Sequence, residues 1–380
     1  MKLRKILFIF FRILLFFIFL GTIPYYLTII YNFPGPEKFS GNAWYNPYEN
    51  HLPVTQKVNL HTHAKAYGGL TFGADSADSM VSAYTQKGYS LVSISDYHSI
   101  EPKQASQKNY LPAYEHGYNL FKIHFNVFGA ENVNFFDYMI YLNTSQKQQM
   151  INMLAEDGNM ISLNHPVMRN GYSPTEMRKL CNYTLMEVWN LFGTSEEYWD
   201  AALSSGHVVF LLANDDSHSL EKGSFRMWNK VLSSSANPDS ICISLKQGKN
   251  YGVWNLWGIY GTIPELDFNI YMKTDTLSFF SSITFDSIHV IVDDGNILSK
   301  NKITNSVSSF IPQQYSYARL KLFAENYQVL FNPVIRYNGV NVQEEYEKTL
   351  SVNWFLSVLF KVGVLLFHLM LWFFWRKLRA

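Results

Sequence analysis

Short apolar runs, each followed at once by polar residues, recur through the middle of the chain. The first two, at 58–60 and 89–95, have the β-rich composition of strands. Between them, residues 75–87 carry apolar positions at helical spacing, and Gly88 suits the end of a helix. Strand, helix and strand joined by short links predict a βαβ unit with parallel strands, and hence an α/β fold.

The pattern returns at 125–130, 160–164, 185–186 and 208–214, and a further helix is predicted over 195–205. In a parallel α/β barrel the carboxyl ends of the strands face one mouth, where active-site groups gather. Histidines follow or end these runs at five positions: His61, His63, His98, His165 and His218. We expect these side chains to converge. The remaining histidines lack that placement and are expected to be surface or core residues: His51, His116, His124, His207, His289 and His368.

The sequence Asn59-Leu60-His61-Thr62-His63 adds a local argument. Residues i and i+2 of a strand project from the same face, so His61 and His63 can place two imidazoles in one pocket. That geometry suits a metal site, although a His-x-His pair also occurs on ordinary strand edges.

Both ends of the chain are apolar. Residues 6–33 follow three basic residues and are long enough to span a bilayer, and 353–375 form a second apolar run followed by basic residues. We predict two transmembrane helices with both termini cytoplasmic, and residues 35–352 across the membrane. The alternatives are a cleaved signal peptide at the first run and a buried core helix at the second.

The charge composition of the chain bears on which classes of partner it can bind. A formal net charge of +1 over 380 residues gives no reason to expect nucleic acid. Cys181 and Cys242 both lie in the exported part, where they either pair or remain separate thiols.

The ordered motifs resemble those of the PHP (polymerase and histidinol phosphatase) superfamily over residues 55–255. The motifs that carry the resemblance are His61-x-His63, Asp96-x-His98, Gly129-Ala-Glu131, Asn164-His165-Pro166, Glu187-Val-Trp-Asn190 and Asp216-x-His218. Residues 244–251, 317–320 and 331–333 also resemble the tail of the branch that includes carbaryl hydrolase-like proteins.

The resemblance implies a distorted, TIM-like (β/α)7 barrel with two or three divalent metal ions at the strand ends. Carried over to this sequence, one metal would be held by His61, His63, Glu131 and Asp216. Glu131 would bridge to a second metal on His165, and His98 with His218 would serve a further position. Asp96 would be either a ligand or a partner that orients a histidine.

Two departures from the family pattern affect the third metal. Residues 64–69 lack the ligand that family members commonly carry after the His-x-His, and Tyr97 separates Asp96 from His98. We therefore predict two metals and leave the third open.

A mixed His and carboxylate set favours Zn, Mn or Fe over Ca or Mg. Two such ions about 3.5–4 Å apart activate water and clamp phosphoryl oxygens, so hydrolysis of a phosphomonoester or phosphodiester by metal-bound hydroxide is predicted. Arg169 and Lys65 follow ligand positions closely and are candidate phosphate contacts, with solvated surface charge as the alternative.

Two other functions remain open. The same metals could hydrolyse a carbamate or carboxylic ester, or the chain could be a membrane-tethered binding protein that retains metals for structure. Double tethering favours a lipid-linked, envelope-polysaccharide or small organophosphate substrate.

Two further segments complete the prediction. Residues 34–54 are rich in Pro and Gly and predict a linker. Residues 260–345 contain short alternating apolar pieces between turns, which predict a small antiparallel β-sandwich.

Overall fold

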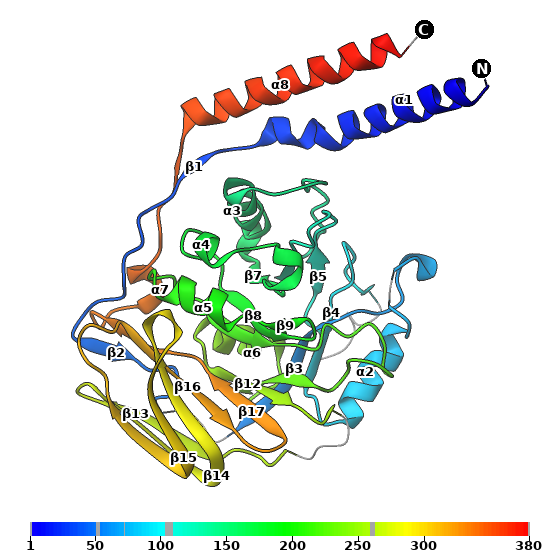
Figure 1. The fold of residues 1–380 in the computed structure, drawn as a ribbon. Coiled ribbons are helices and arrows are strands. Elements are labelled where there is room, and N and C mark those ends of the chain that lie inside the picture. The colour runs from blue at the N-terminus through cyan, green and yellow to red at the C-terminus, as the bar shows by residue number, and fades with distance from the viewer. Residues whose placement is uncertain (1, 51–53, 72, 103–108, 259–262, 379–380) are drawn as a thin grey trace.

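The protein is a mixed α/β molecule with two long helices at its ends (Figure 1). The computed structural model describes residues 2–50, 54–71, 73–102, 109–258 and 263–378. His51 and part of the predicted linker lie outside the described residues.

Seven strands close into a ring that carries the predicted motifs. They are β3 (Thr55–Thr62), β4 (Leu91–Ile94), β5 (Ala113–His116), β6 (Phe125–Phe128), β7 (Met160–Leu163), β8 (Leu185–Asn190) and β10 (Phe210–Ala213). Regular ladders join β3 to β4, and join β5 through β6, β7 and β8 to β10. Two parallel bridges close the ring, Tyr97 with Glu115 and Thr62 with Ser217.

One strand of the ring is reversed. β6 pairs antiparallel with both β5 and β7, whereas the other neighbouring pairs are parallel. The mouth of the ring therefore receives the carboxyl ends of six strands and the amino end of β6. An all-parallel arrangement, which the sequence analysis assumed, would have brought the other end of β6 to this mouth.

Helices cover the ring where the sequence supplies caps. They are α2 (Ala77–Gln86), α3 (Thr144–Leu154), α4 (Pro174–Met177), α5 (Glu196–Leu203) and α6 (Pro238–Lys246). The Ser76 hydroxyl accepts from the Ser79 N–H at the start of α2, and Asn143 with Gln146 forms a capping box on α3. The helices predicted over 75–87 and 195–205 are confirmed as α2 and α5. Short 3-10 turns lie at Ile23–Leu27, Tyr67–Gly69, Glu156–Gly158, Met168–Asn170 and Asp293–Gly295.

The second half of the chain extends the sheet of the ring. Its strands are β11 (Met227–Leu232), β12 (Asn250–Asn255), β13 (Phe268–Lys273), β14 (Thr276–Val292), β15 (Asn296–Phe310), β16 (Tyr317–Phe323), β17 (Tyr327–Phe331) and β18 (Val334–Tyr337). β11 pairs with β3, and β12 pairs with β17, so one continuous sheet of eleven strands crosses the boundary predicted near residue 260. The predicted sandwich is thus antiparallel but shares its sheet with the ring.

A buried ion-pair network joins these two halves. The Arg319 guanidinium on β16 donates from Nε and Nη2 to the two carboxylate oxygens of Asp200 on α5, at 2.8 and 2.6 Å. The Tyr317 hydroxyl donates to the same carboxylate at 2.8 Å. Glu196, one turn earlier on α5, pairs with Arg319 and Lys321. We call these five residues the junction network.

The two ends of the chain lie together. α1 (Lys2–Thr22) and α8 (Trp354–Lys377) run side by side, with both termini at the same end (Figure 1). His368 of α8 bonds Thr22 at 2.7 Å and Tyr26 at 2.9 Å. Residues 5–27 and α8 are long and apolar enough to cross a membrane, and most of both is exposed. A signal sequence near an N-terminus meets the same criterion of length and composition.

Short strands secure the segments beside the long helices. β1 (Tyr31–Asn32) pairs with β19 (Ser351–Val352), and β2 (Ala43–Tyr45) pairs with β18. The predicted linker over 34–54 therefore contains a strand of the main sheet. The remaining elements are β9 (Gly193–Thr194) and α7 (Val342–Glu345). Cys181 and Cys242 are both free thiols.

Candidate metal centre

The mouth of the ring gathers buried imidazoles and carboxylates from five strands. His61 and His63 end β3, Glu115 lies on β5, and His124 immediately precedes β6. His165 follows β7 and Asp216 follows β10. All six are at most 2% exposed, which is unusual for groups of this polarity. His165 and Asp216 also adopt positive φ angles of 31° and 48°, a backbone conformation that non-glycine residues rarely take outside functional sites.

The Nε2 atoms of His61 and His63 lie between carboxylate oxygens of Glu115 and Asp216. The Nε2 atoms of His61 and His63 lie 3.1 Å apart, and both lie 3.2–3.3 Å from Asp216 Oδ1. Glu115 places Oε1 3.4 Å from His61 Nε2 and Oε2 3.3 Å from His63 Nε2. A tetrahedron with metal–ligand bonds of 2.0–2.1 Å has edges of about 3.3–3.4 Å. The two histidine nitrogens are therefore spaced from each other and from the nearest carboxylate oxygens about as ligands of a transition-metal ion are.

A second set shares the Glu115 carboxylate. Glu115 Oε1 lies 2.9 Å from His124 Nδ1 and 3.2 Å from His165 Nε2. These three groups could hold a metal ion, with Glu115 as the bridge between the two sets. A third group consists of His63, Asp216 and His218, and the His218 side chain is 26% exposed at the edge of the cluster.

Buried polar partners orient the candidate ligands. Glu187 on β8 accepts from His61 Nδ1 at 2.7 Å and from the His165 N–H at 3.1 Å, and is held by Asn190 and Asn214. A carboxylate on Nδ1 leaves the Nε2 lone pair of His61 free to face a metal. Asp96 accepts from the Ala64 N–H at 2.7 Å and lies 3.9 Å from His63 Nδ1. In this structure Asp96 is thus a neighbour of a ligand and belongs to none of the ligand groups.

The electrostatics of the cluster favour a cation. Burial alone would lower the pKa of His61, but the charges of Asp216, Glu187 and Glu115 outweigh it and hold that pKa well above its usual value. Burial would raise the pKa of Glu115, yet His124 and His61 hold it well below. The field that would retain a proton on His61 is the field that would bind a divalent ion in its place.

Several buried atoms of the cluster have no hydrogen-bond partner in the described structure. They are His63 Nδ1, Glu115 Oε2, His124 Nε2, His165 Nδ1 and Asp216 Oδ1. Buried polar atoms are normally satisfied, because each orphan costs about 1–3 kcal/mol. The two carboxylates with such an oxygen are Glu115 and Asp216, and each is surrounded by two or more histidine nitrogens. The residues present therefore fit transition-metal ions.

The structure places two of the ligands predicted from the motifs outside the candidate ligand groups. Glu131 is exposed and lies beyond the far end of β6, because that strand is reversed. Glu115 instead belongs to two of the candidate groups, and His124, which was expected to have no site role, belongs to one of them. His98 is buried, but its Nε2 accepts from the Gly117 N–H and its Nδ1 lies 3.2 Å from the Asn134 carbonyl, so it belongs to none of the ligand groups.

The predicted phosphate contacts are also placed differently. Lys65 and Arg169 are exposed, and Arg169 donates to the Leu120 carbonyl at 3.3 Å. Lys122 places its ammonium group 5.6 Å from the centre of the Tyr97 ring. Tyr97 in turn stacks on His63 at 4.6 Å. Lys122 precedes the reversed strand, and nothing in its sequence context indicated that this end of the strand faces the mouth.

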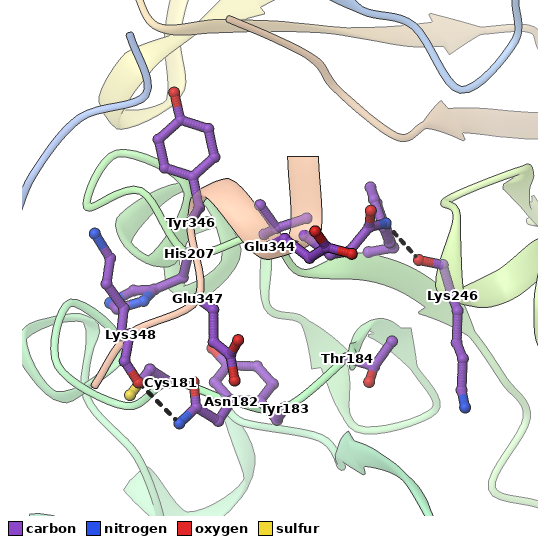
Figure 2. Close-up of a pocket in the computed structure, with 13 residues that line it drawn as sticks. Cys181, Asn182, Tyr183, Thr184, His207, Lys246, Glu344, Tyr346, Glu347 and Lys348 are labelled. Carbon is purple, nitrogen blue, oxygen red and sulfur yellow. Dashed lines mark hydrogen bonds between the residues drawn. The ribbon is translucent and has the colours of Figure 1, made fainter. Parts of the chain in front are cut away.

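A separate pocket of about 310 Å³ lies at the opposite end of the ring, before β8 and β10. Figure 2 shows Asn182 donating to the Lys348 carbonyl, at 3.1 Å, across this pocket. Gln343 donates to the Lys246 carbonyl at 2.9 Å. None of the pocket's lining residues belongs to the ligand groups. We interpret it as the seam between the ring and the segment that leads to α8.

No protein-family model and no curated protein sequence matches the chain. Among solved structures, the chain is similar to a two-domain protein from Bacteroides vulgatus ATCC 8482 that contains a predicted PHP-like metal-dependent phosphoesterase. The identity is 12% and the TM-score 0.44, over 84% of this chain and 99% of that one. We infer the function from the residues of the site itself.

Proposed function

We propose that the protein is a metal-dependent phosphoesterase that hydrolyses a phosphomonoester or phosphodiester. The observation that carries the proposal is the buried group of His61, His63 and Glu115, whose imidazole nitrogens and carboxylate oxygens lie 3.1–3.4 Å apart, with Asp216 Oδ1 3.2–3.3 Å from both nitrogens. Imidazole with carboxylate favours Zn, Mn or Fe. The strand ring and the resemblance of its motifs to the PHP superfamily agree with this class.

Two ions account for most of the cluster. The first would be held by His61, His63 and Glu115, with Asp216 beside both histidines, and the second by Glu115, His124 and His165. When bound, such a pair lowers the pKa of water and neutralises the charge of a phosphoryl group. His218 lies at the exposed edge, where a third ion or a substrate oxygen could reach it.

The chain's own groups have separate tasks in this proposal. Glu187 fixes the tautomer of His61 by accepting from its Nδ1. Lys122 places a positive charge beside the cluster, where a phosphate would need one. Asp96 lies beside His63, and burial raises the pKa of its carboxyl to about 6. Such a carboxyl can hold or release a proton near neutral pH.

We also propose that the chain is anchored in a membrane by residues 5–27 and α8, with both termini cytoplasmic. Their side-by-side, antiparallel packing, with both termini at the same end, supports a two-span hairpin (Figure 1). Basic residues outside both spans support the orientation. The site would then face the extracytoplasmic side.

The test is the metal content of the full-length chain in detergent together with its hydrolysis of an aryl phosphate. We expect about two transition-metal ions per chain, and loss of both metal and turnover in His61→Ala/His63→Ala. The matched control is His207→Ala, since His207 lies in the seam at the other end of the ring. Bound metal with turnover of an aryl ester or carbamate alone would replace the phosphoesterase by an ester hydrolase. Absence of bound metal would contradict the catalytic proposal.

A further inference from the structure

Two loops beside the metal centre expose an unusual amount of apolar surface. They follow β5 and precede α3, and their side chains are 36–64% exposed: Tyr118, Leu120, Phe121, Phe135, Met139, Ile140 and Tyr141. We call these seven residues the apolar platform. Contiguous apolar patches on a protein surface commonly mark a site of interaction.

The platform is held together as one surface. The Phe121 and Tyr141 rings meet edge-on at 5.3 Å, and the Tyr118 hydroxyl donates to the Phe135 carbonyl at 3.1 Å. Asp137, the only acid within 117–123 and 133–142, is 1% exposed and accepts from the Tyr118 N–H at 3.0 Å. The platform therefore presents aromatic and aliphatic groups without an exposed carboxylate among them.

The platform is continuous with the end of the first candidate membrane span. The Tyr25 hydroxyl donates to the Tyr141 carbonyl at 2.7 Å and accepts from the Tyr141 N–H at 2.9 Å. A Cβ added to Gly21 would lie 3.6 Å from the Met139 sulfur. Figure 1 shows the chain between β5 and α3 on the side of the body that faces α1. Tyrosines at such a position suit the boundary between lipid and water.

The inner side of the same loops faces the metal centre. His98, beside the site, lies 5.2 Å from the Tyr118 ring and 5.8 Å from the Phe135 ring. Lys122, which ends the first loop, points its ammonium group toward Tyr97. The loops thus carry apolar groups on the outside and a cation on the side of the cluster.

We propose that the apolar platform enters the outer surface of the bilayer and that the substrate is an amphiphilic phosphoester. Its phosphate would reach the metal centre past Lys122 while its apolar chain stays in the lipid. This inference rests on the proposed phosphoesterase function and membrane anchoring, and it selects a lipid-borne substrate over a soluble one. A bilayer is the partner that the continuity with residues 5–27 favours.

Insertion is measured directly with a fluorescent probe. Leu120→Cys is labelled with an environment-sensitive fluorophore in a Cys242→Ser background, since Cys181 is buried. The full chain is reconstituted into vesicles of phosphatidylcholine and phosphatidylglycerol. Val340→Cys, at an 84% exposed apolar position outside the platform, is the control. We expect brominated lipids to quench the probe at 120 and not at 340. Equal quenching at both positions would overturn the docking proposal without touching the phosphoesterase function.

Substrate choice is measured as a ratio of rates in the same vesicles. The ratio compares phosphatidic acid with a soluble aryl phosphate. We expect Leu120→Ser/Phe135→Ser to lower this ratio at least about tenfold, because apolar contact area sets the strength of interfacial binding. An unchanged ratio, or a wild-type chain that hydrolyses the aryl phosphate alone, would overturn the lipid-substrate proposal. Hydrolysis of neither compound would instead contradict the proposed function.

Discussion

The junction network and the candidate metal centre both bury charge, but they differ in how fully their charged groups are hydrogen-bonded. At the junction, Asp200 receives two bonds from Arg319 and one from Tyr317, and each charge has an opposite partner in contact. At the candidate metal centre, two carboxylates lie among several imidazoles, and Glu115 Oε2 and Asp216 Oδ1 accept no hydrogen bond from the described residues.

This difference distinguishes charges that hold the fold together from charges that are available to bind a ligand. An ion pair whose groups are fully hydrogen-bonded fixes two elements to each other and leaves no free acceptor or donor for a ligand. An open cluster of ligand-type atoms at coordination spacing requires a further cation to become complete. The predictions below test this distinction, from the largest expected effect to the smallest.

The largest effect is expected at the bridging carboxylate. Glu115→Gln removes a charge that both ligand sets share, so metal affinity and turnover should fall by more than the roughly 100-fold typical of losing an orienting partner. The measurement is metal content by mass spectrometry with aryl phosphate turnover.

Glu131→Gln is the matched control, because the sequence motif assigns Glu131 the same role and the structure exposes it. If Glu131→Gln lost metal and Glu115→Gln kept it, the assignment of the bridge from the structure would be wrong.

Arg319→Met should reduce stability and spare the metal. It leaves the Asp200 carboxylate, whose side chain is 5% exposed, buried without its partner. Breaking a buried pair in this way costs about 3–5 kcal/mol of unfolding free energy. Denaturant unfolding measures the loss, and the metal content per folded chain should stay at the wild-type value. A drop in metal content at full stability would contradict a purely structural junction.

Removal of metal should lower the stability of every variant that keeps the metal ligands. A chelator should lower the midpoint of thermal unfolding, because an ion that binds only the folded chain at about 100 times its Kd stabilises it by about 2.7 kcal/mol. Arg319→Met should show the same chelator effect as the wild type, whereas His61→Ala/His63→Ala should show none. Unfolding followed by circular dichroism provides the comparison.

The smallest effect concerns pH at the junction. Burial would raise the pKa of Glu196, but Arg319 and Lys321 outweigh it and lower that pKa below its usual 4.5. The ionised carboxylate therefore contributes stability that is complete above pH 4.5 and is lost as the pH falls through the lowered pKa. Glu196→Gln should flatten the wild-type decline in unfolding free energy below pH 4.5. Parallel curves for the two proteins would contradict this role.

Sequence reasoning located the mouth of the ring because strand ends carry visible motifs. His61, His63, His165 and Asp216 follow apolar runs whose direction is that of most of the ring. Glu115 was missed because β5 is only four residues long and its apolar character is weak. Glu115-His116 does end a strand, so it follows the same pattern of a strand ending in ligand-type residues.

The direction of β6 could not be obtained from the sequence. An apolar run of four residues reads the same whether its strand pairs parallel or antiparallel, and the pairing is decided by contacts with β5 and β7. That single reversal exchanged Glu131 for His124 at the mouth. The sequence also does not show that the two halves share a sheet, because β12 and β17 pair although they are distant in sequence.

The pairing of the first strands with the last has a consequence for how the chain matures. β1 can pair only after β19 has been synthesised, and β2 only after β18. Residues 31–45 therefore have no strand partner until nearly the whole chain has been made. If the body is exported, its main sheet is complete only after β18 has crossed, and the separate β1–β19 pair only after residue 352, just before α8 arrives. Assembly of the sheet and entry of the second helix into the bilayer would then be neighbouring events in biogenesis, and the protein would mature already attached at both ends.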